Sequence, residues 1–123
     1  IAAARGVASR PLAREIDRVS GEAREGRSQL EDLPGGTITI TSTGNIGGVL
    51  ATPIINTPEV AILGITAIRK RPVVRDDEIV IREMLNLSLS LDHRIVDGAD
   101  GALFMRDMIA YLEDPKLLLL GSL

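Results

Sequence analysis

The chain has 123 residues, a net charge of −3 and no cysteine. Hydrophobic residues make up 45% of it and charged residues 25%, proportions typical of a folded domain and unlike those of a disordered segment. Without cysteine it has no disulfide, thiol nucleophile or zinc–thiolate site. Its negative charge and two aromatic residues argue against a nucleic-acid partner, and no apolar run approaches the ~18–20 residues of a membrane helix. We therefore expect a soluble protein that binds neither nucleic acid nor membranes.

The N-terminal part predicts an amphipathic helix from about Ser9 to near Gly26. Four apolar residues recur there at steps of four, three and four, with charged residues between them: Leu12, Ile16, Val19 and Ala23. The following stretch to residue 36 is polar and contains glycine and proline, which predicts a loop.

Residues 37–43 alternate between isoleucine and hydroxyl side chains, which predicts a strand with one apolar and one polar face. The glycine-rich run 44–48 follows at once. Neither the dinucleotide-binding pattern nor the P-loop lysine is present, so a plain turn is favoured there over a ligand cradle.

Further strands are expected in the second half of the chain. The continuous apolar run 60–65 predicts a strand buried on both faces. A basic cluster at 69–71, before Pro72, could meet a cofactor phosphate, but a solvated turn at the strand end is the more frequent meaning of such a cluster. Segments 78–82 and 83–91 predict two more strands, with the first pairing onto the second.

The only histidine, His93, follows the last of these strands. Leucines alternate with polar residues along 85–92, and continuing the alternation places His93 on the leucine side. An imidazole at the edge of an apolar interior would remain a neutral base near pH 7, which suits proton transfer. The alternative is a structural histidine satisfied by hydrogen bonds.

Other kinds of site fit the sequence poorly. A zinc or iron site needs two or three nitrogen or carboxylate ligands, and one histidine is present; no Gly-x-Ser-x-Gly nucleophile motif occurs. Asp97 has a structural interpretation as the N-cap of a helix that begins near Gly98 and ends at 113–115. Its apolar stripe is Ala102, Met105, Ile109 and Leu112. The leucines 117–120 predict a tail that docks on the core or on a neighbouring subunit.

Five sequence motifs follow one another along the chain: 35–42, 44–48, 52–64, 71–74 and Asp92-His93-Arg94-x-x-Asp97-Gly98-Ala99. Together they resemble the catalytic domain of the dihydrolipoamide acyltransferases, the E2 cores of 2-oxoacid dehydrogenase complexes. The resemblance extends from about Leu12 to Leu120.

This resemblance implies a chloramphenicol-acetyltransferase-like α/β fold, a mixed sheet flanked by helices, here incomplete. In that fold trimers place each active site at a subunit interface, and trimers assemble into a cubic or dodecahedral core. His93 matches the family's catalytic base, which takes the proton of the dihydrolipoamide or coenzyme A thiol. Thr41 matches the position whose hydroxyl, from the facing subunit, bonds the oxyanion, and Asp97 matches the motif's second aspartate, which orients the base.

The resemblance also sets expectations for the whole protein. Coenzyme A and lipoamide are the acyl-carrying substrates, without a metal, and the motifs assign no residue to coenzyme A. Residues 1–123 are expected to be the C-terminal part of the catalytic domain, without the lipoyl and peripheral-subunit-binding domains through which E1 and E3 associate, and to have little activity alone. Acetyl or branched-chain transfer is favoured over succinyl, in the bacterial cytoplasm or the mitochondrial matrix. The alternative is a non-catalytic scaffold, which the presence of His93 disfavours.

Overall fold

A computed structural model describes residues 9–29 and 35–117. The chain divides into two compact units, Ile1–Thr37 and Ile38–Leu123. Its elements, in chain order, are α1 (Ser9–Arg24), β1 (Thr39–Ser42), β2 (Ala61–Ile65), β3 (Arg69–Arg75), β4 (Glu78–Met84), β5 (Leu87–Leu91) and α2 (Gly98–Glu113). No helix among these residues is long and apolar enough to cross a bilayer.

The first unit contains α1, which confirms the predicted N-terminal helix. Arg18 bonds Glu15 and Glu22, one turn away on either side, and these pairs lie along the polar side of the helix. The backbone N–H of Gly26 bonds the carbonyl of Ala23, with Gly26 at φ 66°. A glycine in the left-handed region is a common end of a helix.

The second unit is built on a three-stranded mixed sheet in the order β1-β2-β5. β1 is parallel to β2, and β5 is antiparallel to it. β2 therefore lies in the middle, where Ile62 and Leu63 are buried, as the apolar run 60–65 predicts. β1 is shorter than the expected strand 37–43.

The two faces of the sheet differ in chemistry. One face carries Ile40, Leu63 and Leu89, which stand side by side in the register of the three strands. The other face carries Thr41, Gly64 and Ser88 in the next row. The predicted division of β1 into an isoleucine face and a threonine face is confirmed.

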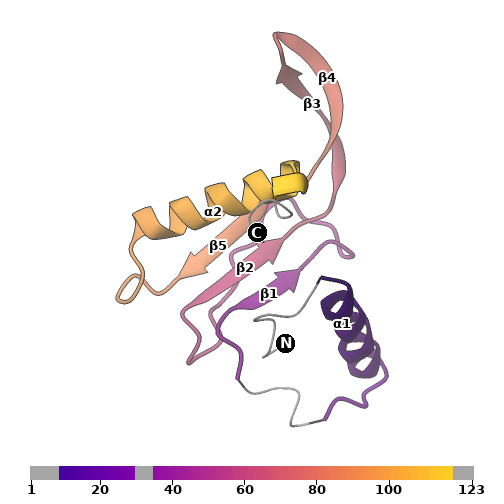
Figure 1. Cartoon of the computed structure of the whole chain (residues 1–123), viewed down its shortest axis with the longest axis vertical. Helices are drawn as coiled ribbons and strands as arrows, with labels where there is room; N and C mark the ends of the chain where they lie inside the picture. Colours follow the sequence, from indigo (N-terminus) through magenta and orange to yellow (C-terminus); the bar gives the residue numbers. More distant parts are fainter. Residues whose placement is uncertain (1–8, 30–34, 118–123) are drawn as a thin grey trace. The chain divides into compact units, whose positions relative to one another are not determined.

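Helix α2 packs on the leucine face of β5 (Figure 1). Gly101 is buried against this strand, since a Cβ there would lie 2.5 Å from Leu91 Cδ2 and 3.7 Å from Leu89 Cδ2. The bounds of α2 agree with the prediction. The predicted apolar stripe is only partly right, because Gly101 is the buried residue of the helix and Ile109 and Leu112 are exposed.

Strands β3 and β4 form a separate antiparallel hairpin, and this arrangement corrects two predictions. Figure 1 shows β2 continuing into β3 and β4 leading back to β5. The basic cluster 69–71 thus lies in a strand and not in a turn. The segment 78–82 pairs with β3 and not with the following strand, whose own partner is β2. The turn is made by Asp76 and Asp77, both at positive φ, as in the two-residue turns that suit hairpins.

Candidate active site

His93 lies in a tight turn between β5 and α2. The carbonyl of Asp92 accepts hydrogen bonds from the N–H groups of Ile95 at 2.9 Å and Val96 at 3.0 Å. The extended backbone of β5 therefore ends before His93, whose side chain is exposed. The prediction that the imidazole continues the leucine face is wrong, because the chain turns one residue too early.

The side chain of Asp92 is held by Arg94 within this turn. Arg94 Nε lies 2.8 Å from Asp92 Oδ1, Arg94 Nη2 lies 2.6 Å from Oδ2, and the backbone N–H of Arg94 also bonds Oδ1 at 3.0 Å. These bonds stabilise the carboxylate and lower the pKa of Asp92 to about 2. Asp92 therefore remains charged near neutral pH and fixes the shape of the turn.

Asp97 is the N-cap of α2, as the sequence predicts. Its Oδ1 accepts the backbone N–H of Asp100 at 2.9 Å, and its carbonyl accepts the N–H of Gly101 at 3.1 Å. A Cβ on Gly98 would lie 3.7 Å from His93 Nε2, so the imidazole lies beside the first turn of α2. Asp97 thereby supports the helix end against which His93 rests.

No hydrogen bond or ion pair from another described residue occupies either ring nitrogen of His93. Within residues 9–29 and 35–117, no hydrogen bond or ion pair joins His93 to either neighbouring aspartate. The same residues contain no group of three or more metal-binding side chains. An exposed imidazole on a fixed turn can accept a proton from an incoming nucleophile.

Thr41 is half-buried on the polar face of β1, and the structure does not bring it to His93. Its row in the sheet continues through Gly64 to Ser88, whereas Leu91, two residues before His93, is paired with Ala61. The row of Thr41 and the end of β5 at Leu91 are three residues apart along the strands, which is about 10 Å. They are also two strands apart across the sheet, which is about another 10 Å. The two side chains cannot act on one substrate atom from the same copy of the chain.

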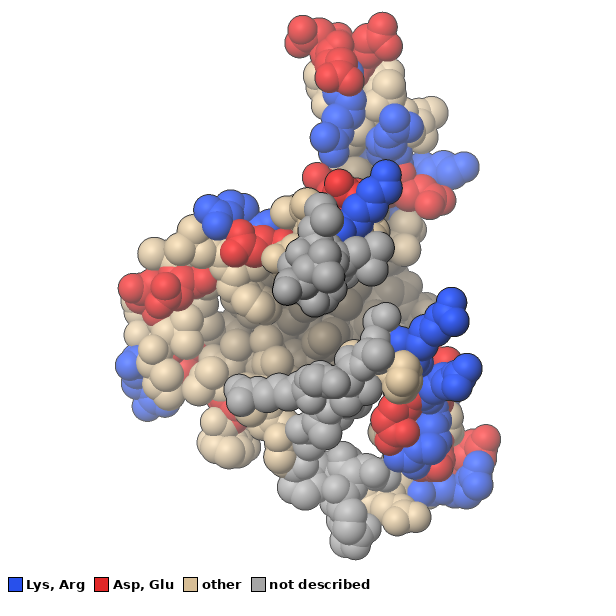
Figure 2. All heavy atoms as spheres, in the orientation of Figure 1, with Lys and Arg blue, Asp and Glu red and all other residues tan. Residues whose placement is uncertain are grey.

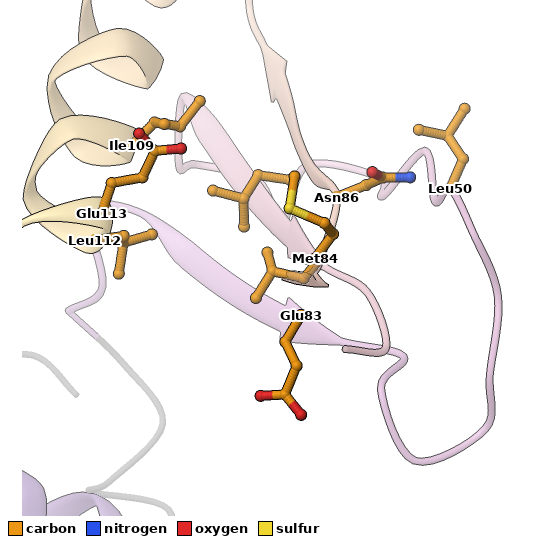
Figure 3. A pocket seen from close by; sticks show the side chains of 9 residues that line it. Leu50, Glu83, Met84, Asn86, Ile109, Leu112 and Glu113 are labelled. Atoms are coloured by element: carbon orange, nitrogen blue, oxygen red, sulfur yellow. The ribbon is translucent and has the colours of Figure 1, made fainter. Parts of the chain in front are cut away.

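A hollow of about 580 Å³ lies elsewhere, between the start of β5 and the C-terminal half of α2. In Figure 3, Leu50 and Asn86 lie on the side opposite to Ile109, Leu112 and Glu113. Its walls are mainly apolar, and none of His93, Thr41 and Asp97 lines it. This hollow is therefore separate from the predicted catalytic residues.

The hairpin brings arginines of the basic cluster, which were expected in a turn, beside an arginine of the following strand. Arg71 stands directly opposite Arg82, and Arg69 lies on the same face of β3. The signal that could have found this pairing is Asp76-Asp77 between Val73-Val74 and Ile79-Val80-Ile81, since Asp tolerates the left-handed conformation better than most residues.

Comparisons with known proteins show the family of the chain. The model of a family described as 2-oxoacid dehydrogenases acyltransferase (catalytic domain) matches residues 1–120. The chain belongs to this family. It is 51% identical to the lipoamide acyltransferase component of the branched-chain alpha-keto acid dehydrogenase complex of Pseudomonas putida, over 85% of this chain and 25% of that protein. Other relatives are named acetyltransferase and succinyltransferase components.

Solved structures of the family have the same fold. An Azotobacter vinelandii dihydrolipoamide acetyltransferase, investigated for the catalytic role of a serine, a histidine and an asparagine, is 38% identical with a TM-score of 0.83, over 89% of this chain and 45% of that one. The cubic core of the pyruvate dehydrogenase multienzyme complex is also 38% identical, with a TM-score of 0.85, over 93% and 47%. The chain thus spans about a quarter of its curated relatives and under half of these solved chains.

Proposed function

We propose that the protein containing this chain transfers an acyl group between dihydrolipoamide and coenzyme A, with His93 as the general base. The observation that carries the proposal is the exposed imidazole of His93, held on a turn that Asp92 and Asp97 fix from either side. Membership of the acyltransferase family supports the same chemistry.

The reaction is a balanced exchange of two thiols. His93 takes the proton of the incoming thiol, whose sulfur then attacks the carbonyl carbon of the thioester. The tetrahedral intermediate breaks its bond to the other sulfur, which leaves as a thiol with the proton that the imidazolium returns. One side chain acts first as a base and then as an acid, as histidine can near neutral pH.

We further propose that Thr41 of one copy acts together with His93 of another copy. Its hydroxyl would donate a hydrogen bond to the oxyanion of the tetrahedral intermediate. The distance between the two residues within one chain supports this arrangement. Further support comes from spacing, because the serine and histidine of the Azotobacter protein are 52 positions apart, as are Thr41 and His93. Its asparagine follows the histidine by four positions, as Asp97 follows His93, so Asp97 is proposed as the residue that positions the base.

For the whole protein we propose an E2 component that forms trimers and a larger core, with residues 1–123 in the C-terminal part of its catalytic domain. E1 and E3 are proposed partners through other domains, in a bacterial cytoplasm or a mitochondrial matrix. Branched-chain or acetyl groups are proposed ahead of succinyl, and the Pseudomonas putida relative supports the first. Rates with isobutyryl-, acetyl- and succinyl-coenzyme A would rank the three.

The test of the base is His93→Ala in the full-length protein, assayed for transfer from acyl-coenzyme A to dihydrolipoamide. We expect a loss of about 10²–10⁴-fold, the usual effect of removing a general base, with an unchanged solution mass. A variant that keeps more than half of the rate would remove His93 from the mechanism. A fully assembled wild-type protein without any transfer would instead support the scaffold alternative.

A further inference from the structure

The polar face of the sheet contains a buried hydroxyl group without a hydrogen-bond partner. Its oxygen is Ser88 Oγ, on β5, and within residues 9–29 and 35–117 no side chain or backbone group bonds it. A buried hydroxyl without a partner lowers stability, because it has lost its bonds to water and gained none. Such a group in a native structure calls for a partner from outside the chain, such as an ordered water.

Ser88 stands in one row with Thr41, the proposed oxyanion donor. The register pairs Thr41 with Gly64 and Gly64 with Ser88, so one glycine separates the two hydroxyl-bearing residues across the sheet. A Cβ on Gly64 would lie 2.5 Å from Ser88 Oγ, which shows that the hydroxyl lies over the glycine. A side chain at position 64 would therefore displace this hydroxyl.

Pro53 closes the space above Gly64. Its ring carbons Cγ and Cδ would lie 3.5 and 3.6 Å from the same Cβ. Neighbouring strands are about 4.8 Å apart, so Thr41 lies about one strand spacing beyond the Ser88 hydroxyl. Two hydrogen bonds of about 2.8 Å that meet at one water span a similar distance. One enclosed water can thus join the two hydroxyls beside the ring of Pro53.

Among the described residues, Thr41 has no other group that orients its hydroxyl. In the next row of the same face Thr39 Oγ1 donates to Glu59 Oε2 at 2.5 Å, but no described residue bonds the side chain of Thr41. The ion pairs that the structure describes in the second unit lie on the hairpin, the His93 turn and α2. Figure 2 shows the charges of the hairpin, acidic at its tip and basic along its length. Ser88 is therefore the partner that the register offers to Thr41.

We infer that Ser88 is a positioning residue for Thr41. The inference rests on the proposed role of Thr41 as the oxyanion donor. The Ser88 O–H donates to the bridging water, the water donates to Thr41 Oγ1, and the Thr41 O–H is thereby directed at the oxyanion. Hydrogen bonds in such a chain polarise one another, so the last donor is strengthened where the negative charge of the intermediate develops. A hydroxyl that weakens the fold is thus retained because it strengthens a bond made in the transition state.

The experiment measures turnover and stability of Ser88→Ala in the full-length, assembled protein. We expect kcat for acyl transfer to fall about three- to tenfold, the effect of one lost neutral hydrogen bond, with the KM of both carriers unchanged, because the bond acts in the transition state. The thermal unfolding midpoint should stay the same or rise, since alanine removes an unpartnered hydroxyl. The matched control is Ser90→Ala, which removes a hydroxyl from the next row of β5 and should leave kcat unchanged.

A second variant displaces the hydroxyl without removing it. Gly64→Ala puts a methyl group against Ser88 Oγ and should lower kcat as Ser88→Ala does. The two substitutions together should cost no more turnover than either alone, because both act on one hydroxyl. A full rate in Gly64→Ala would show that the place of the hydroxyl is immaterial and would overturn the inference.

The Thr41→Ala background separates this inference from the proposed function. If Ser88 acts through Thr41, Ser88→Ala should not lower the residual rate of Thr41→Ala any further. The inference fails if kcat is unchanged in Ser88→Ala, if the loss is equally large in the Thr41→Ala background, or if the unfolding midpoint falls. A Thr41→Ala protein that kept the wild-type rate would instead contradict the oxyanion role of Thr41 itself, and the inference with it.

Discussion

At the residue scale, Asp97 is the N-cap of α2, and it is also the residue proposed to position His93. Its bond to the N–H of Asp100 caps α2, and the first turn of that helix lies against His93. Aspartate and asparagine cap helices about equally well, because either side chain offers an oxygen to the backbone N–H. The asparagine at the corresponding spacing in the Azotobacter protein fits this expectation.

We therefore expect Asp97→Asn to retain both stability and most of the activity, whereas Asp97→Ala should cost about 0.5–2 kcal/mol of stability. The thermal unfolding midpoint and the rate of acyl transfer, measured for both variants, check this. If Asp97→Asn abolished turnover at an unchanged midpoint, the carboxylate itself would take part in the reaction.

The pair of Asp92 and Arg94 predicts a dependence of stability on pH. Arg94 lowers the pKa of Asp92 from its ordinary value of 3.8 to about 2, so the stabilisation is complete above about pH 4 and is lost as the pH falls towards 2. Asp92→Asn should thus lower the unfolding midpoint by a small, constant amount above pH 4, because water screens the exposed guanidinium of Arg94. Below pH 3 the difference should shrink, and a difference that grew on acidification would contradict this account.

At the scale of elements, α2 depends on a glycine for its contact with β5. Alanine favours a helix over glycine by up to about 1 kcal/mol, but a Cβ at Gly101 would be 2.5 Å from Leu91 Cδ2. Overpacking of this kind costs about 1–3 kcal/mol, so the steric term should prevail.

Gly101→Ala should therefore lower stability, measured by urea unfolding, despite its better helix propensity. The same substitution in a Leu91→Ala background removes the obstructing methyl groups and should be neutral or stabilising. Equal destabilisation in both backgrounds would show that the contact with Leu91 is not the cause.

Sequence patterns predicted those elements whose structure depends mainly on residues close together in the sequence. The apolar run at 60–65 gave the buried middle strand, and Asp97 gave the start of α2. Strand pairing was not predictable in the same way, since segment 78–82 could pair with either neighbour. The predicted position of His93 was wrong because two turn bonds, from the N–H groups of Ile95 and Val96 to the carbonyl of Asp92, end the alternation of β5.

At the scale of the whole molecule, the described residues leave much apolar surface uncovered. Ile40 is 64% exposed on β1, Ile79 is 78% exposed on the hairpin, and Leu112 is 61% exposed on α2. Large exposed apolar side chains on several elements are typical of a protein that makes contact with other protein surfaces. This exposure agrees with a protein whose subunits cover one another, as the proposed site between copies requires.

The most direct test of that site is complementation between two inactive variants of the full-length protein. His93→Ala and Thr41→Ala are purified separately, dissociated, mixed in equal amounts and allowed to reassemble. If His93 of one copy works with Thr41 of another, about a quarter of the mixed sites regain both side chains, and acyl transfer should rise to about that fraction of the wild-type rate. Mixing without dissociation is the control and should restore nothing. Reassembled particles that show no more activity than their two parents would contradict a site shared between copies.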